Sequence, residues 1–376
     1  MLDLIASCAA GIESLVKKEL IDLGYTVESH NGYVKFRGDL IDIIKTNIWL
    51  RTADRIKILL REDVITEFAQ LYDLINAMSW EDLLPLDAQI IVTGKSKKST
   101  LHSVPDIQSI IKKAIIDRLQ NYYHHYSLLP ENGAQFKLIF DLTKDKFQLT
   151  LDTTGNSLFK RGYRQSKGDA PLKENMAAAL ILLTNWHPED MPFIDPMCGS
   201  GTIPIEAAMI ARKIAPGINR NFTYENWNFM TDEMINEVKD EAFSMADYDN
   251  QFMIYGSDIN SKMIDIAKNN TRFAGLSNDV KYSIFDVRKF APKNKNGVVV
   301  TNPPYGDRLM DEQSVKQLYS DMGKAFIPLT TWSFYILTSY LNFEKIYGKR
   351  CTKKRKLYNG ALRTDYYQYW GKPIWH

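Results

Sequence analysis

Hydrophobic residues near the N-terminus alternate between two spacings, one typical of strands and one typical of helices. Asn31-Gly32 is a dipeptide that favours the tight turn of a β-hairpin. The predicted elements, in chain order, are a strand over 2–7, a helix over 11–23, two strands within 26–36, a helix over 40–50 and a strand over 55–61. This order predicts a ferredoxin-like unit, which we assign to residues 1–64.

A second α/β region is predicted over residues 65–154. Its helical patterns cover 67–77 and 105–123, and its strand patterns cover 88–94, 134–141 and 146–151. Lys95, Lys97 and Lys98 follow the first of these strands and are expected to form a basic loop. Short basic runs are common, so a phosphate-contacting surface and an ordinary solvated loop both remain open.

The pattern changes after a segment rich in Gly, Thr, Ser and Arg, and we place a linker at 155–170. From 171 to 376, longer helices alternate with strands, which is typical of a mostly parallel, doubly wound sheet. The first helix is expected over 171–186, with Asp169 as its cap and Pro171 near its first turn. The chain is therefore predicted to be an α/β protein with a Rossmann-like C-terminal domain.

Composition narrows the class of protein. The 376 residues predict two or three domains, and 45% hydrophobic with 24% charged residues is ordinary for a folded chain. No uninterrupted apolar run of about 18 residues is present, so we expect no membrane span. The three cysteines lie far apart, and the six histidines lack metal-ligand spacing, so we expect neither a disulfide scaffold nor a metal site. The few cysteines also fit a cytoplasmic location, which we predict. A net charge of +2 means that any nucleic-acid binding depends on local patches.

A glycine-rich turn is the first candidate ligand site. A short apolar strand ends at Asp195, and residues 196–202 then lead through Gly199 and Gly201 into a helical pattern. The phosphate-loop motif and the full dinucleotide motif are both absent. A carboxylate at the strand end repels a pyrophosphate but suits a ligand with an ammonium group and ribose hydroxyls. S-adenosyl-L-methionine has both.

Two further strands are predicted to end in carboxylates, at Asp258 and Asp286. Asp258 can accept the ribose hydroxyls, and Asp286 can contact the adenine amine. The long interval between Gly201 and Asp258 is explained by an insertion over about 212–250. Each carboxylate could instead be a helix cap or a surface acid, but their repetition at strand ends beside a glycine-rich turn favours ligand contact.

The segment Asn302-Pro303-Pro304-Tyr305 follows a strand that is expected to be buried. Such a segment can be simply a tight turn. It also lies where open α/β sheets bind ligands, and its prolines have carbonyls but no N–H groups. The Asn302 amide oxygen and the Pro303 carbonyl can accept both protons of an exocyclic amine, and Tyr305 can stack on the base. The methyl of a sulfonium is already activated, so positioning suffices without a strong base.

The glycine-rich turn after Asp195 and the Asn302–Tyr305 segment resemble motifs of class I methyltransferases that act on exocyclic amines. Residues 151–164 and 171–179 narrow the resemblance to THUMP-domain methyltransferases of the bacterial 23S rRNA guanine-N2 group, over nearly the whole chain. The resemblance implies an RNA-binding ferredoxin-like plus THUMP module and one class I methyltransferase domain; the fused second methyltransferase of some relatives is not expected. It implies cofactor contacts at Asp195, Met197, Gly199, Gly201, Asp258 and Asp286, and catalytic roles for Asn302, Pro303 and Tyr305.

Basic residues outside this site are candidates for RNA contact. The predicted set is Lys95, Lys97, Lys98, Arg161, Arg164, Lys354 and Arg355. Arg161 and Arg164 could instead connect the domains, and the lysines near 354 could instead protect an edge strand from pairing. Cys198, within the glycine-rich turn, is expected to be a small packing residue and not a nucleophile.

The sequence predicts an S-adenosyl-L-methionine-dependent enzyme that methylates the N2 amine of a guanosine in 23S rRNA or a large-subunit precursor. The guanine would have to be flipped out or single-stranded. A tRNA guanine-N2 methyltransferase and a non-catalytic RNA-binding assembly factor remain alternatives. An adenine-N6 DNA methyltransferase would share the Asn-Pro-Pro-Tyr segment but would not explain the N-terminal module.

Overall fold

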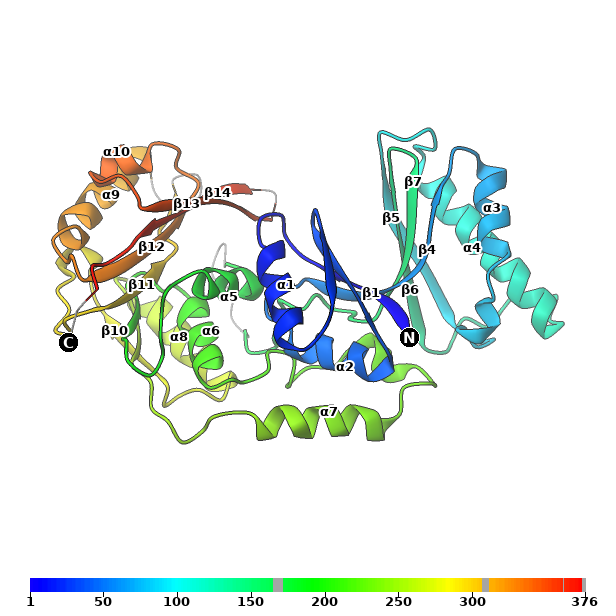
Figure 1. Ribbon diagram of the computed structural model, residues 1–376, viewed down its shortest axis with the longest axis horizontal. Coiled ribbons are helices and arrows are strands. Elements are labelled where there is room, and N and C mark those ends of the chain that lie inside the picture. Colours follow the sequence, from blue (N-terminus) through cyan, green and yellow to red (C-terminus); the bar gives the residue numbers. More distant parts are fainter. Residues whose placement is uncertain (165–171, 306–310, 361, 374–376) are drawn as a thin grey trace.

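The computed structural model describes residues 1–164, 172–305, 311–360 and 362–373, and these residues build two seven-stranded sheets (Figure 1). The first sheet belongs to the N-terminal part of the chain and the second to the C-terminal part. In both parts of the chain, helices alternate with strands, so the predicted α/β class is confirmed. Asp169 and Pro171, expected at the start of a helix, lie outside the described residues.

The first sheet has the strand order β2-β3-β1-β4-β7-β6-β5. Its first four strands are antiparallel and carry two helices between them, which is the predicted ferredoxin-like arrangement. Only β5 and β6 pair in parallel within this sheet. The elements are β1 (Leu2–Ser7), α1 (Glu13–Asp22), β2 (Val27–His30), β3 (Tyr33–Gly38), α2 (Leu40–Trp49), β4 (Arg55–Val64), α3 (Phe68–Asn76), the 3-10 helix η1 (Trp80–Asp82), β5 (Gln89–Lys97), α4 (Val104–Tyr123), β6 (Gln135–Thr143) and β7 (Lys146–Asp152).

Strand β4 joins the two N-terminal units into one continuous sheet. It pairs with β1 at its beginning and with β7 along most of its length, with a register shift between Leu59 and Arg61. The sequence pattern predicted this strand only to residue 61, but the pairing with β7 carries it to Val64. Strand β4 therefore contributes to both units, and the boundary that the sequence predicts after residue 64 falls at its end.

The segment from Lys95 to Lys97 corrects one prediction. It is not a loop but the end of β5, because its backbone pairs with residues 141–143 of β6. The turn begins at Lys98, which has a positive φ of 53°.

Helix α4, which follows, is the longest helix described, at 20 residues. Among the described residues, no helix is both long and apolar enough to cross a membrane.

The second sheet has the order β10-β9-β8-β11-β12-β14-β13. Neighbours from β10 to β12 pair in parallel, whereas β14 is antiparallel to both β12 and β13. This is the mostly parallel sheet that the sequence predicted. Its elements are α5 (Glu174–Leu182), β8 (Phe193–Asp195), α6 (Thr202–Ala211), η2 (Thr223–Asn226), α7 (Asp232–Ser244), β9 (Ile254–Asp258), α8 (Ser261–Phe273), β10 (Val280–Ile284), η3 (Val287–Lys289), β11 (Gly297–Thr301), α9 (Glu312–Phe326), β12 (Trp332–Thr338), α10 (Phe343–Tyr347), β13 (Lys353–Asn359) and β14 (Leu362–Tyr369).

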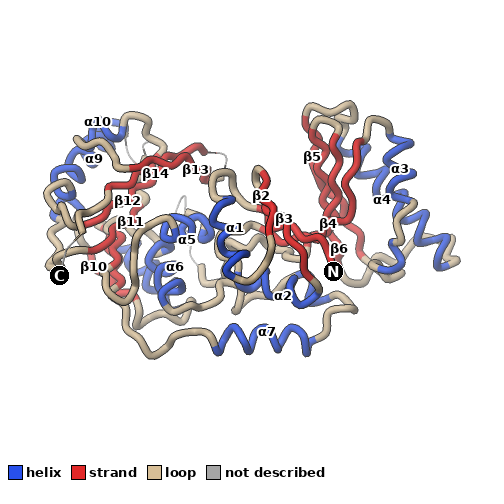
Figure 2. The backbone as a smooth tube through the Cα atoms, viewed as in Figure 1, coloured by secondary structure: helices blue, strands red, loops and turns tan. Residues whose placement is uncertain are grey.

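Helices cover both faces of the second sheet (Figure 2). Along β11, Val298 and Val300 belong to the core cluster that contains α5 and α6, whereas Val299 belongs to the cluster that contains α9 and α10. Successive side chains of a strand point to opposite faces, so β11 is buried on both sides. This explains why its sequence is a continuous apolar run rather than an alternating one.

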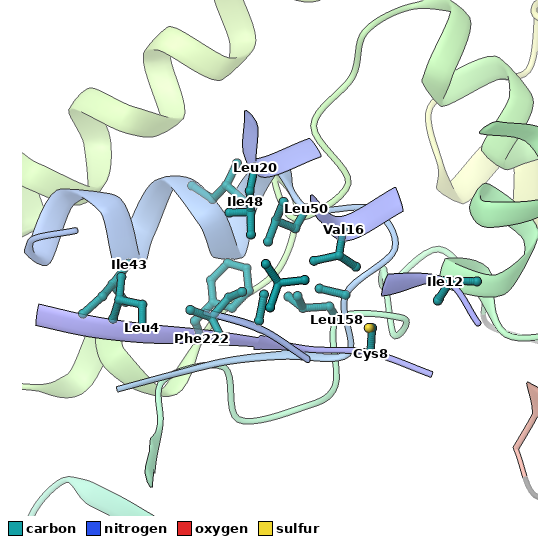
Figure 3. Close-up of a cluster of buried hydrophobic side chains, with 14 of the residues drawn as sticks. Leu4, Cys8, Ile12, Val16, Leu20, Ile43, Ile48, Leu50, Leu158 and Phe222 are labelled. Atoms are coloured by element: carbon teal, nitrogen blue, oxygen red, sulfur yellow. The ribbon is translucent and has the colours of Figure 1, made fainter. Parts of the chain in front are cut away.

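The core of the N-terminal unit is completed by residues from later in the chain (Figure 3). Leu158, from the segment after β7, and Phe222, from the insertion between β8 and β9, are buried among side chains of α1 and α2. Helix α7 of the same insertion packs against α2. Burial of these apolar surfaces holds the two halves of the molecule together.

Candidate active site

The predicted site residues converge at the carboxyl ends of four parallel strands. Asp195 pairs in register with Gly256 of β9, and Asp258 pairs with Ile284 of β10. β11, which ends one residue before Asn302, lies directly beside β8. Adjacent parallel strands bring their carboxyl ends to the same edge of the sheet, where such sheets bind ligands. The structure thus brings together side chains that lie far apart in the sequence.

The glycine-rich turn between β8 and α6 requires its two glycines. Gly199 and Gly201 have positive φ angles of 50° and 83°, and Gly201 directly precedes the first turn of α6. A Cβ on Gly201 would lie 2.7 Å from the hydroxyl of Tyr282 and 3.0 Å from Cβ of Ala267. A side chain at this position would therefore be strained by the backbone and also blocked by its neighbours.

Asp258 fixes this turn from the neighbouring strand. The backbone N–H of Gly199 donates to its Oδ2 at 3.0 Å, and the N–H of Asn260 donates to its Oδ1 at 2.9 Å. The N–H of Cys198 also donates to the carbonyl of Ser257, at 2.9 Å. A carboxylate has about four lone-pair positions, so Asp258 keeps acceptor capacity for a ligand.

Asp195 is almost fully enclosed, with 1% of its surface exposed. Its Oδ1 accepts from the hydroxyl of Thr301 at 2.8 Å and from the N–H of Met197 at 3.2 Å. Its pKa is raised to about 7, mainly by burial and also by the negative charge of Asp258, against the lowering effect of the two hydrogen bonds. The bond to Thr301 connects this carboxyl group to the strand that leads into Asn302.

Asp286 has a different environment from the other two carboxylates. It caps η3 by accepting from the N–H of Arg288 at 3.0 Å, and it forms an ion pair with the Arg288 guanidinium at 2.6 Å. The hydrogen bond from the Arg288 side chain lowers its pKa. The structure therefore shows the capping role that the sequence left as an alternative, and a contact between Asp286 and the adenine remains a prediction.

Two apolar side chains at this edge were missed by the sequence reasoning. Ile259 directly follows Asp258 and is 64% exposed, and Phe285 directly precedes Asp286 and is 37% exposed. Large apolar side chains that remain exposed beside half-buried carboxylates are suited to the flat faces of an adenine ring. Their position next to the strand-end carboxylates is the signal that could have identified them.

The Asn-Pro-Pro-Tyr turn begins directly after β11. Pro303 is buried, while Asn302 and Tyr305 are half-buried. The amide oxygen of Asn302 is buried without a hydrogen-bond partner among the described residues. Such an atom costs free energy unless something bonds to it, so it marks a position for a donor that the chain itself does not supply.

Cys198 lies in the glycine-rich turn with 7% of its surface exposed. Burial raises the pKa of its thiol, and the charges of Asp195 and Asp258 raise it further. A thiol in such surroundings is not activated as a nucleophile. Among the described residues, no group of three or more His, Cys, Asp or Glu side chains could hold a metal ion.

Two of the arginines predicted to contact RNA have their partners inside the molecule. Arg161 is 3% exposed, donates to the carbonyls of Leu158 and Arg51, and pairs with Glu206 at 3.4 Å. Arg164 donates to the hydroxyl of Thr202 at 2.7 Å and pairs with Glu174. Arg161 therefore connects the two halves, which was the alternative interpretation, whereas the partners of Arg164 all lie in the C-terminal half.

The other predicted RNA contacts lie at or just after the end of β5 and on β13, which belong to different sheets (Figure 1). The side chain of Lys95 is 69% exposed and pairs with Asp141, and Lys97 and Lys98 are also close to this end of β5. Lys354 is exposed on the edge strand β13, whereas Arg355 is half-buried and contacts Ser14 of the N-terminal unit at 3.5 Å. RNA binding by these residues stays a prediction.

Three family descriptions match successive parts of the chain. Residues 3–57 match the RlmL ferredoxin-like domain, residues 66–152 match the THUMP domain, and residues 161–368 match the RMKL-like methyltransferase domain. The last match alone covers more than half of the 376 residues. It includes every strand of the second sheet except for Tyr369, the last residue of β14.

Known sequences support the same relationship. The chain is 48% identical over 370 residues to "Putative RNA methyltransferase YpsC" of Bacillus subtilis (strain 168), covering 98% of this chain and 96% of the relative. It is 31% identical to "Ribosomal RNA large subunit methyltransferase K/L" of Psychromonas ingrahamii, covering 96% of this chain but 49% of that protein. The chain thus spans about half the length of the K/L relatives that it matches.

Solved structures share the whole fold. One is SMU.472, described as a putative methyltransferase complexed with SAH, with a TM-score of 0.94, 48% identity and coverage of 100% and 99% of the two chains. Another is described as a predicted N6-adenine-specific DNA methylase from Listeria monocytogenes, with a TM-score of 0.94, 51% identity and coverage of 99% and 96%. The first description names no methyl acceptor, whereas the second names adenine in DNA.

Proposed function

This chain belongs to the RMKL-like methyltransferase family with ferredoxin-like and THUMP domains, and from this premise we propose that it transfers a methyl group from S-adenosyl-L-methionine to the N2 amine of a guanosine in 23S rRNA. The observation that carries the proposal is the buried amide oxygen of Asn302, which has no partner among the described residues. An amine of the substrate is the donor that suits this position. We assign the RNA-binding module to residues 1–64 and 65–154, the linker to 155–170 and the methyltransferase domain to 171–376.

The residues at the strand ends fit the proposed cofactor. Asp258 retains acceptor capacity for ribose hydroxyls beside the exposed face of Ile259, and Phe285 offers a second apolar surface for the adenine. Asp195 carries a carboxyl group suited to the cofactor's positive charge, and Met197, Gly199 and Gly201 form the adjacent turn. When bound, S-adenosyl-L-methionine supplies a methyl group that its sulfonium has already activated. The relative complexed with SAH supports this assignment.

The Asn-Pro-Pro-Tyr turn can hold and activate the target amine. The Asn302 oxygen and the Pro303 carbonyl would each accept one N–H of the amine, which leaves the nitrogen lone pair directed toward the methyl donor. If the nitrogen takes the methyl carbon while the bond from that carbon to sulfur breaks, it becomes positively charged, and the same two acceptors would stabilise that charge. One proton then passes from the nitrogen to solvent. Tyr305 would stack on the flipped base.

The choice of RNA over DNA rests on the N-terminal half. Residues 3–57 and 66–152 match a ferredoxin-like domain and a THUMP domain, which an enzyme acting only on DNA would not need. The K/L relative is named as a methyltransferase of large-subunit ribosomal RNA. We therefore favour 23S rRNA or a large-subunit precursor over tRNA. The cytoplasmic location predicted from the sequence belongs to the same proposal.

The test uses purified protein, labelled S-adenosyl-L-methionine, an unmodified transcript of the 23S peptidyl-transferase region, a tRNA pool and a duplex DNA. Nucleosides are then identified by mass spectrometry. N2-methylguanosine in the 23S transcript alone supports the proposal. N2-methylguanosine in tRNA alone, or N6-methyladenine in DNA, would overturn the substrate assignment. If no free nucleic acid is labelled, large-subunit precursor particles are tested next, and absence of label there leaves the binding-factor alternative.

A further inference from the structure

A buried tyrosine on α9 holds the Asn-Pro-Pro-Tyr turn from behind. Tyr319 is 0% exposed, and its hydroxyl donates to the carbonyl of Pro304 at 3.0 Å. The same hydroxyl lies 2.9 Å from the hydroxyl of Thr338, at the end of β12. Neither contact takes part in the chemistry proposed above. They nevertheless connect that turn to two other elements of the catalytic domain.

The direction of each hydrogen bond in this group follows from its chemistry. A carbonyl can only accept, so the single hydroxyl proton of Tyr319 is used by Pro304. Thr338 must then donate its own proton to the Tyr319 oxygen. The Thr338 oxygen in turn accepts from the backbone N–H of Tyr340 at 3.1 Å. The result is a directed chain from Tyr340 through Thr338 and Tyr319 to Pro304, in which each bond polarises the next.

The turn needs such support because of its own sequence. Pro303 and Pro304 have no N–H groups, so this turn cannot be fixed by hydrogen bonds that those two residues would donate. Engagement of the Pro304 carbonyl by Tyr319 sets the peptide plane between Pro304 and Tyr305. It also means that Pro304 is already satisfied, which leaves the Asn302 oxygen and the Pro303 carbonyl as the proposed acceptors for the substrate.

We propose that Tyr319 is a positioning residue for methyl transfer, which acts by fixing the Asn302–Tyr305 turn through the Pro304 carbonyl. The inference rests on the proposed function, because it assigns a role within the same site. Tyr319 touches neither the substrate amine nor the cofactor. Its loss should therefore slow the chemical step and leave ligand binding unchanged. Misplacement of a catalytic group by about 1 Å can cost a hundredfold in rate.

The ring of Tyr319 has its own packing, which makes a clean substitution possible. It lies edge-on to Phe343 and Tyr340, with ring centroids 5.0 and 5.8 Å apart. Tyr319→Phe keeps these contacts and removes only the hydroxyl. Tyr366→Phe is the matched control, because Tyr366 is also 0% exposed and also donates to a backbone carbonyl, that of Leu180 at 2.9 Å on α5.

The experiment compares wild type, Tyr319→Phe and Tyr366→Phe for kcat, for KM with each substrate and for thermal melting. We expect both variants to melt slightly earlier, but only Tyr319→Phe to lose about tenfold or more in kcat, with both KM values within about twofold. Thr338→Val should lower kcat to a smaller extent, because Tyr319 then loses its donor but still bonds to Pro304. Thr338→Ser should retain activity. Equal kcat for the two tyrosine variants would overturn the proposal.

A second measurement does not depend on finding the substrate. Hydrogen–deuterium exchange of a peptide spanning 298–305 reports on the amides of Asn302 and Tyr305, which flank the two prolines. We expect faster exchange in Tyr319→Phe than in wild type, and no change in Tyr366→Phe. If wild-type protein methylates no RNA, the proposed function fails and exchange alone decides the inference. Unchanged exchange would then overturn it.

Discussion

The two sheets of this molecule differ in how some of their polar groups are paired. On the first sheet, charged side chains pair with one another: Lys35 with Glu62, Arg55 with Asp152, and Lys95 with Asp141. At the carboxyl edge of the second sheet, the Asn302 oxygen has no partner among the described residues, and the Asp195 carboxyl has a raised pKa. Polar groups that the fold satisfies contribute to structure, whereas groups that it leaves unsatisfied are available to a ligand.

The largest expected effect comes from breaking the buried ion pair between Arg161 and Glu206. Arg161→Ala leaves Glu206 buried at 0% exposure without its charged partner. Removing one member of a buried ion pair costs about 3–5 kcal/mol, so we expect a loss of that size in the free energy of unfolding by urea. Lys35→Ala, which breaks the more exposed pair with Glu62, is the control and should cost less than about 1 kcal/mol. A small effect of Arg161→Ala would show that this ion pair contributes little to holding the two halves together.

The next largest effect concerns the unsatisfied amide. Asn302→Ala removes the proposed acceptor and should lower kcat by about a hundredfold to a thousandfold, as loss of one transition-state hydrogen bond does in other enzymes. RNA affinity in a filter-binding assay should not change, and thermal stability should not fall. Asn185→Ala, which removes a side chain bonded to Tyr335 away from the site, serves as a comparison for general damage. Full methylation by Asn302→Ala would refute a catalytic role.

The pH dependence of cofactor binding distinguishes Asp195, whose pKa is raised, from Asp286, whose pKa is lowered by Arg288. Asp195 has a pKa of about 7, and a bound cation favours its ionised form. We therefore expect S-adenosyl-L-methionine to bind about tenfold more tightly near pH 8 than near pH 6, measured by calorimetry. The stability of the ligand-free protein should change in the opposite direction. Because the pKa of Asp195 is raised in the folded state, its contribution makes folding less favourable as the pH rises from about 4 to about 7. Asp195→Asn should abolish this part of both dependences, and an unchanged profile would contradict the assignment.

The smallest expected effects are on the exposed lysines. Lys95→Ala breaks an exposed ion pair and should change the free energy of unfolding by less than about 1 kcal/mol. If Lys95 contacts RNA phosphates, RNA affinity should fall about equally for different sequences, and the salt dependence of binding should decrease by about one ion. Lys354→Ala gives the same measurement on β13. An unchanged salt dependence in both variants would remove these two positions from the proposed RNA surface.

Much of this architecture was accessible from the order of elements. The ferredoxin-like arrangement and the mostly parallel second sheet follow from local periodicity and turn residues, and both were predicted. The extension of β4 to Val64 and the continuation of β5 through Lys97 were not, because each depends on pairing with a strand far away in the sequence. A lysine-rich segment does not reveal by itself that its backbone forms part of a sheet.

The candidate site was predicted to a similar extent. The carboxylates, the glycine-rich turn and the Asn-Pro-Pro-Tyr segment stand at strand ends, and parallel strands bring such ends together. The sequence could not indicate that Asp286 is paired with Arg288, that Ile259 and Phe285 stay exposed, or that Tyr319 supports Pro304. Each of these depends on how side chains pack after the strands have aligned.

By itself, the sequence determined which elements form, which chemical groups stand at the ends of the strands, and which family the chain resembles. Only the tertiary structure decided which charged groups are free. Arg161 looks like an RNA contact in a basic segment, but its donors are used by Arg51 and Glu206, which are distant in sequence. A side chain's availability depends on its burial and its partners, and both are set by contacts between distant parts of the chain.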